Sequence, residues 1–241
     1  MAKRKDARIY LLYHKDVDYG LWDNSLYEPK SVFDSKIGEL NPIYCEMSGT
    51  FDIWKRHPKS LKYIGQCQYR RRLELEEDFD FEGFFKEADI LVADPIYFQT
   101  SVREQYANCH NVEDLDKMEK ILKEKYPEYS EDWNNRIKGG NVLFYSQGWV
   151  MKAEDFDIYC KWLFSLLKEF CKREKIETVE AARKHVEEAA ITWKYKCNPI
   201  DVTYQTRICG YLAERLFTLY VFHNFKNIAC HAYTKFEGIN F

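Results

Sequence analysis

The sequence lacks the segments that export or membrane insertion requires. Residues 1–6 are charged and lead into only a short apolar run, unlike a secretory signal. No apolar stretch approaches the roughly 18 residues of a membrane-spanning helix. The eight cysteines include no C-x-x-C pair, which argues against a zinc ribbon, and without export we expect them to be reduced. These absences predict a cytoplasmic protein.

An excess of positive charge is also missing. The chain has 36 basic and 39 acidic side chains among 241 residues, so its formal net charge is −3. Domains that bind duplex nucleic acid are normally basic, and we therefore expect no nucleic-acid partner. With 46% hydrophobic and 31% charged residues, the composition is that of a globular protein and excludes a disordered or fibrous chain.

Four common catalytic and nucleotide-binding motifs are absent. The chain contains no GxGxxG, GxxxxGK[ST], GxSxG or HExxH. Their absence argues against a dinucleotide oxidoreductase, a P-loop NTPase, a common serine hydrolase and a zinc protease of the HExxH type. It leaves open the α/β proteins that bind nucleotides without a glycine-rich loop.

No linker rich in glycine, serine or proline interrupts the chain, and no repeat is present, so residues 1–241 are expected to form one domain. Strands and helices alternate over the first two thirds, which predicts an α/β fold with a mostly parallel central sheet flanked by helices and a helical C-terminal third. The expected strands are Arg8–Tyr13, Lys62–Tyr69, Asp89–Ala93 and two short strands within Asn141–Met151. The expected helices run from Asn41 to before Pro58, from Asn111 to before Pro127, and over Phe156–Phe170, Thr178–Ala190 and Tyr204–Phe222.

Ligands of such sheets bind outside the carboxyl ends of the strands. Three polar segments occupy these positions, at 14–16, 68–71 and 147–148. The second contains Arg70 and Arg71, followed by Arg72, and three adjacent guanidiniums repel one another unless they are paired. An anionic phosphate ligand would relieve this repulsion, because arginine binds phosphate through a planar fork. The alternative is a surface network with the acids of 74–77.

Four Asp-x-Asp triplets occur, and such pairs can bind Mg²⁺ or Mn²⁺. Asp16 and Asp18 are the best placed, because they directly follow the first strand. In a chain this rich in acids, the triplets also arise by chance. These two aspartates are therefore only a fallback metal site.

The last predicted helix presents three chemically distinct residues on one face. Arg207, Gly210 and Glu214 lie at offsets of three and seven, opposite the apolar stripe. Glycine inside a helix costs about 1 kcal/mol relative to alanine, which a helix tolerates where something approaches its backbone closely. The arginine and the glutamate could serve as an anion clamp and a general base. An ordinary solvated helix face is the alternative.

Short segments along almost the whole chain form one ordered series. They are 14–15, 40–46, 53–55, 63–65, 69–71, 104–106 with His110 and Asp114, 126–129, Phe156 with 159–160 and 162–164, and Arg207 with Gly210 and 214–216. In this order they resemble one family, the glycosyltransferases of bacterial capsule and O-antigen synthesis grouped as domain of unknown function 4422. The family usually has histidine where this chain has Gln68, and asparagine where it has Gln147. The loop after the first strand is shorter here.

The resemblance implies a nucleotide-binding domain of the glycosyltransferase A type. It implies transfer of a hexose, of the galactosyl or galactofuranosyl type, from a UDP-sugar to a glycan or lipid-linked glycan acceptor. A lipid-linked acceptor and the basic residues 3–5 are compatible with a peripheral position at the inner face of the membrane.

Many enzymes of this fold neutralise the leaving diphosphate with a metal on an Asp-x-Asp motif, where this chain has Tyr69, Arg70 and Arg71. We therefore expect Arg70 and Arg71 to stabilise the diphosphate, with no metal required and Mn²⁺ or Mg²⁺ optional. Glu214 is the expected base of an inverting transfer. The residues expected on the donor side are His14, Lys15, Glu46, Tyr69, Arg207 and Gly210. Those expected on the acceptor side are Gln147, Gly148 and Trp149.

Two other functions fit parts of the sequence. Gln68 in place of histidine slightly favours a non-catalytic protein that binds or scaffolds glycans on the same fold. Acids at Asp16 and Asp18 would suit another phosphate-ligand enzyme, such as a nucleotidyltransferase.

Overall fold

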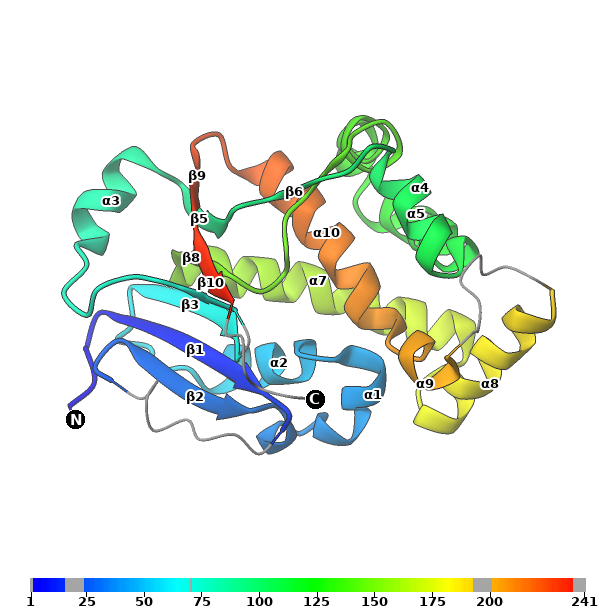
Figure 1. Ribbon diagram of the computed structural model, residues 1–241, viewed down its shortest axis with the longest axis horizontal. Coiled ribbons are helices and arrows are strands. Elements are labelled where there is room, and N and C mark those ends of the chain that lie inside the picture. Colours follow the sequence, from blue (N-terminus) through cyan, green and yellow to red (C-terminus); the bar gives the residue numbers. More distant parts are fainter. Residues whose placement is uncertain (1, 16–23, 70, 193–200, 236–241) are drawn as a thin grey trace.

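The computed structural model describes residues 2–15, 24–69, 71–192 and 201–235, which form a central sheet with helices on both faces (Figure 1). The strands are β1 (Ala7–Tyr13), β2 (Tyr27–Ser31), β3 (Tyr63–Gln68), β4 (Arg71–Leu73), β5 (Ile90–Ala93), β6 (Ile96–Tyr97), β7 (Val142–Leu143), β8 (Trp149–Lys152), β9 (Ile228–His231) and β10 (Tyr233–Lys235). The α-helices are α1 (Asn41–Tyr44), α2 (Met47–Arg56), α3 (Phe81–Glu87), α4 (Val102–Cys109), α5 (Val112–Lys125), α6 (Ser130–Asp132), α7 (Ala153–Glu174), α8 (Val179–Ile191), α9 (Val202–Gln205) and α10 (Ile208–Asn224). Short 3₁₀ turns cover Val32–Asp34, Gly38–Leu40 and Pro127–Tyr129, and a π-helix covers Trp133–Lys138.

The sheet is mixed, with most strands pointing the same way. β1 pairs parallel with both β2 and β3, and β5 pairs parallel with β9. β8 lies between β3 and β5 and is antiparallel to each. β5 therefore runs in the direction of β3, and the expected α/β architecture with a mostly parallel sheet is confirmed. A short extension, β4 with β10, continues antiparallel from the end of β3.

The first strand explains why the sheet has helices on both faces. All but the last residue of β1 are buried, so neither face of the strand meets solvent. Tyr10 and Leu12 belong to the larger core, whereas Ile9 and Leu11 belong to the smaller one. This alternation follows from the two-residue period of a strand. The smaller core is closed by aromatic side chains of α3.

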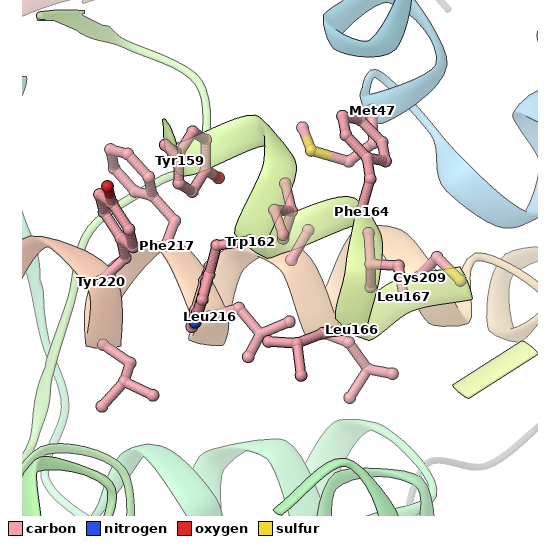
Figure 2. Packing of buried hydrophobic residues seen from close by; sticks show 14 of the residues in the cluster. Met47, Tyr159, Trp162, Phe164, Leu166, Leu167, Cys209, Leu216, Phe217 and Tyr220 are labelled. Atoms are coloured by element: carbon pink, nitrogen blue, oxygen red, sulfur yellow. The ribbon is translucent and has the colours of Figure 1, made fainter. Parts of the chain in front are cut away.

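The larger core is built around α7 and α10, which lie side by side (Figure 1). Figure 2 shows Tyr159 and Trp162 of α7 next to Phe217 and Tyr220 of α10, with Phe164 reaching toward Met47 of α2. The ring centroids of Trp162 and Tyr220 are 5.1 Å apart. Much of the 17% aromatic content therefore serves packing between helices and sheet.

The helix expected from Asn41 to before Pro58 is broken in two at Cys45. This residue has φ of +50°, a conformation that L-residues rarely adopt. Asn41 lies inside α1 rather than capping it, and its amide donates to the Cys45 carbonyl oxygen at 2.8 Å. The same carbonyl oxygen accepts from the Ser48 amide at 3.1 Å and the Ser48 hydroxyl at 2.9 Å, so the side chain of Asn41 ties α1 to the first turn of α2.

After its helical segment, the chain returns to the sheet as β9 and β10, which the sequence analysis did not predict. The two strands expected within Asn141–Met151 are present, but β7 pairs with β6 in a separate two-stranded sheet. In the part of the chain that is described, no helix is both long and apolar enough to cross a membrane.

Candidate functional site

The carboxyl ends of β1 and β3 meet, because these strands are parallel neighbours. Leu12 is aligned with Gln68, and the Tyr69 amide donates to the Leu12 carbonyl oxygen at 3.0 Å. The His14 ring lies edge-on to the Tyr69 ring, with centroids 5.3 Å apart. Lys15 follows and is exposed. The structure thus brings together two of the three polar segments selected from the sequence.

The break at Cys45 places Glu46 against this strand edge. Glu46 is buried, and its Oε1 accepts a hydrogen bond from Gln68 Nε2 at 2.5 Å. Gln68, which stands where the family usually has histidine, therefore orients the Glu46 carboxylate. A buried carboxylate needs such a donor, since its desolvation is otherwise unfavourable.

A small cavity of about 170 Å³ opens beside this pair. It draws residues from the end of β1, the α1–α2 junction and the segment around α9. Three of the predicted donor-side residues, His14, Glu46 and Arg207, lie on its wall together. The full lining is His14, Asn41, Pro42, Cys45, Glu46, Thr203 and Arg207.

Gly210 allows α10 to approach the Cys45 break. A Cβ at Gly210 would lie 2.8 Å from Cys45 Sγ and 3.1 Å from Cys45 Cβ. The sequence analysis expected something to approach the helix backbone closely at Gly210. In the structure, this neighbour is Cys45, at the junction of α1 and α2. Donor binding by Gly210 stays a prediction.

Glu214 lies one helical turn beyond Gly210 and is paired with a buried arginine. Arg215, 2% exposed, donates from Nη1 to Glu214 Oε2 at 2.9 Å and from Nη2 to Gln105 Oε1 at 2.5 Å. Burial raises the pKa of Glu214, the nearby Glu46 carboxylate adds to the rise, and Arg215 and Arg71 oppose it. A carboxylate with a raised pKa is better suited to accept a proton near neutral pH.

Arg71 faces this same region, and Arg72 points the other way. The Arg71 guanidinium lies 4.3 Å from the Tyr145 ring centroid and 5.9 Å from that of Tyr233. The Arg72 guanidinium lies over Tyr27, which belongs to the smaller core. This is the alternation expected of adjacent strand residues.

Arg71 does not form the alternative surface network with the acids of 74–77. Within the described chain, its contacts are the two tyrosine rings and no ion pair. Glu77 instead accepts hydrogen bonds from the backbone amide and hydroxyl of Ser25. Arg70 lies outside the described residues.

The predicted acceptor-side residues lie at the start of β8. Gly148 has φ of +121°, its amide donates to the Gln66 carbonyl oxygen at 2.8 Å, and Gln147 beside it is half-buried. Trp149 is 1% exposed, and its Nε1 donates to the Ser146 carbonyl oxygen. Its indole packs in the larger core, which corrects the expectation that it contacts an acceptor. The apolar area that an indole buries explains this placement.

The fallback metal ligands, Asp16 and Asp18, lie outside the described residues. The rest of the chain contains no group of three or more histidine, cysteine or acidic side chains arranged to hold a metal ion, as far as the structure describes it.

Two residues of the site were missed, Arg215 and Tyr145. Arg215 lies three residues after Leu212 and four before Leu219, on the apolar stripe itself. A charged residue on a core stripe indicates a buried, paired charge, and this signal was available. Tyr145 precedes β8 and contacts Arg71 only because β4 folds back beside β3, which no local pattern predicts.

Comparisons with known proteins identify the family and the fold. The family model for a domain of unknown function, DUF4422, matches residues 33–188. A solved structure entitled "WbbM bifunctional glycosytransferase apo structure" is similar in fold, with a TM-score of 0.70 at 20% sequence identity. The match covers 97% of this chain and 46% of that one, so the chain spans about half the length of its structural neighbour. No curated protein matches the chain.

Proposed function

This chain belongs to the DUF4422 family, and we propose on that premise that it is a glycosyltransferase. Its donor would be a UDP-linked hexose of the galactosyl or galactofuranosyl type, and its acceptor a glycan or a lipid-linked glycan. The reaction would invert the anomeric carbon. The fold shared with the bifunctional glycosyltransferase WbbM supports this proposal.

The observation that carries the proposal is the convergence of opposite charges around one strand edge. Carboxylates at Glu46 and Glu214 and guanidiniums at Arg71 and Arg207 come from three separate segments of the chain, the α1–α2 junction, β4 and α10 with its N-cap. Glycosyl transfer needs positive charge for the departing diphosphate and a base for the acceptor hydroxyl. Both kinds of group are present here within electrostatic reach of one another.

We assign the residues as follows. Arg71, with Arg70 and with Lys15 or Arg207, would stabilise the negative charge that develops on the leaving diphosphate. Glu214 would accept the proton of the acceptor hydroxyl as that oxygen attacks the anomeric carbon. His14 and Glu46 would hold the nucleotide or the sugar, and Gln147 and Gly148 would lie on the acceptor side.

In this assignment a metal ion is optional, because guanidiniums supply the positive charge. Mn²⁺ or Mg²⁺ could still bind through Asp16 and Asp18. Complete loss of wild-type transfer on addition of a chelator would contradict the assignment.

Arg70→Ala should reduce the rate of transfer far more than it reduces folding stability, and full turnover by that variant would contradict the role of Arg70.

The observation that favoured a non-catalytic protein has another explanation. Gln68 has a role at the site without being histidine, because its side-chain amide donates a hydrogen bond to the Glu46 carboxylate. We therefore retain the enzymatic proposal.

Release of UDP from a panel of UDP-hexoses, measured with and without glycan acceptors, tests the activity. We expect turnover of one UDP-hexose by the wild type and a loss of at least about 100-fold in Glu214→Gln, with nucleotide binding retained. Glu87→Gln, which changes an exposed acid on α3, is the matched control, because α3 packs on the smaller core and supplies no residue of the site. Undiminished transfer by Glu214→Gln would remove Glu214 as the base.

A further inference from the structure

A stack of aromatic rings extends from the protein interior to the surface beside the cavity. His110 is buried, and its ring stacks on Tyr211 with centroids 3.7 Å apart. The Tyr211 ring is 5.5 Å from that of Tyr204, and its hydroxyl donates to the Tyr204 carbonyl oxygen at 2.7 Å. Tyr204 ends the stack and is 46% exposed.

The buried end of the stack is held rigidly. His110 Nδ1 is 3.0 Å from Gln205 Oε1, and burial lowers the pKa of His110 to about 3. The ring is therefore neutral at pH 7, and its stacking on Tyr211 involves no charge. Because the rings below it are fixed, Tyr204 can bind a ligand with little loss of side-chain entropy.

The exposed end of the stack is flanked in the sequence by two residues of the cavity described above. Thr203 and Arg207, on either side of Tyr204 in the sequence, both line that cavity. The Arg207 guanidinium lies 5.4 Å from the Tyr204 ring centroid. An exposed aromatic ring beside a cation matches a sugar, which combines an apolar C–H face with hydroxyl groups along its edge.

We infer that Tyr204 is the floor of a subsite for a sugar ring of the glycan acceptor, away from the reacting ring. This inference rests on the proposed function. At a rise of about 1.5 Å per residue, Glu214 and Arg207, the N-cap of α10, are about 10 Å apart along the helix, and the Tyr204 ring of the preceding α9 lies at the Arg207 end. That separation exceeds one sugar ring. An acceptor whose hydroxyl lies at Glu214 therefore reaches Tyr204 only through a further ring.

The test measures binding of methyl β-galactoside and of methyl glycosides with two and three galactose rings by NMR titration. In the wild type, we expect affinity to rise with ring number, and in Tyr204→Ala we expect about tenfold weaker binding of the longest glycan. Tyr204→Phe should retain this gain, because it keeps the ring. Tyr97→Ala, which removes a 70% exposed tyrosine on β6, is the matched control.

Titration of the same variants with UDP separates this inference from the proposed function. We expect equal UDP affinity in wild type and Tyr204→Ala. Weaker UDP binding in Tyr204→Ala would assign the ring to the nucleobase and overturn the inference. The inference would also be overturned if affinity still rose with the number of galactose rings in Tyr204→Ala. It would equally be overturned if affinity did not rise with ring number in the wild type. Absence of UDP binding to the wild type, with the glycan gain intact, would contradict only the proposed donor.

Discussion

At the residue scale, the candidate base and the buried cation beside it form one unit. Arg215 is almost fully buried, and its Nη1 forms an ion pair with Glu214 Oε2. Removing one member of a buried pair leaves an uncompensated charge, which typically costs about 3–5 kcal/mol. The arginine also opposes the rise in the pKa of Glu214 that burial causes.

We predict that Arg215→Met shifts the acid limb of the pH–rate profile to higher pH. The base must be ionised, and its pKa already lies above the ordinary glutamate value in the wild type. Without Arg215, the pKa rises further, so transfer is lost at a higher pH as the solution is acidified. Arg215→Lys, which keeps the charge, should shift the limb less. The measurement is kcat/KM against pH, and an unmoved or lowered limb in Arg215→Met would exclude this electrostatic role.

At the scale of elements, the site depends on the contact between α10 and the break that separates α1 from α2. Gly210 leaves room for Cys45, and the positive φ of Cys45 turns Glu46 toward Gln68. Two unusual local features, an interior helix glycine and a strained cysteine, therefore explain each other.

We predict that Gly210→Ala destabilises the protein by about 1–3 kcal/mol, despite the better helix propensity of alanine. The added Cβ would lie 2.8 Å from Cys45 Sγ. Adding Cys45→Gly removes the clash and suits the positive φ, so the double variant should recover much of the loss. Chemical denaturation of the four proteins of this cycle measures the coupling. Additive effects would show that the two positions do not interact.

The sequence analysis predicted helix and strand boundaries correctly where the signal lies in neighbouring residues. Asn111 caps α5, and α5 ends before Pro127, as the capping and breaker rules require. The break at Cys45 was missed because the apolar spacing continues through it and only the approach of α10 enforces it. β9 and β10 were missed because both are short and pair with strands far away in sequence, and β9 is largely half-buried rather than apolar throughout.

At the scale of the whole molecule, the strand order brings the site together from distant segments. His14, Arg71 and Glu214 were selected from the sequence because polar residues at strand ends and opposite a core stripe are unusual, whereas Glu46 was selected through the family resemblance. Their proximity follows from topology, which local patterns do not contain. The burial of Trp149 likewise depends on β8 lying between β3 and β5.

The burial of His110 should make the free energy of unfolding depend on pH. Its pKa is about 3 in the folded protein and about 6.5 when unfolded, so the unfolded state binds the proton first. The stability that the neutral ring contributes is present above pH 6.5 and declines as the pH falls toward 3. Between pH 6.5 and 5, this amounts to about 2 kcal/mol. In His110→Phe, the decline in unfolding free energy should be smaller by that amount, and an identical decline would contradict the assignment.

The central claim is that the Arg71 guanidinium, at the strand edge that also holds Glu46 and Glu214, takes up the diphosphate of a nucleotide. Calorimetric titration of UDP into wild type and Arg71→Ala tests it most directly, with circular dichroism to confirm that the variant is folded. We predict that UDP binds the wild type and that Arg71→Ala weakens binding at least tenfold, or by about 1.4 kcal/mol. Equal affinity of the two folded proteins for UDP would contradict the account.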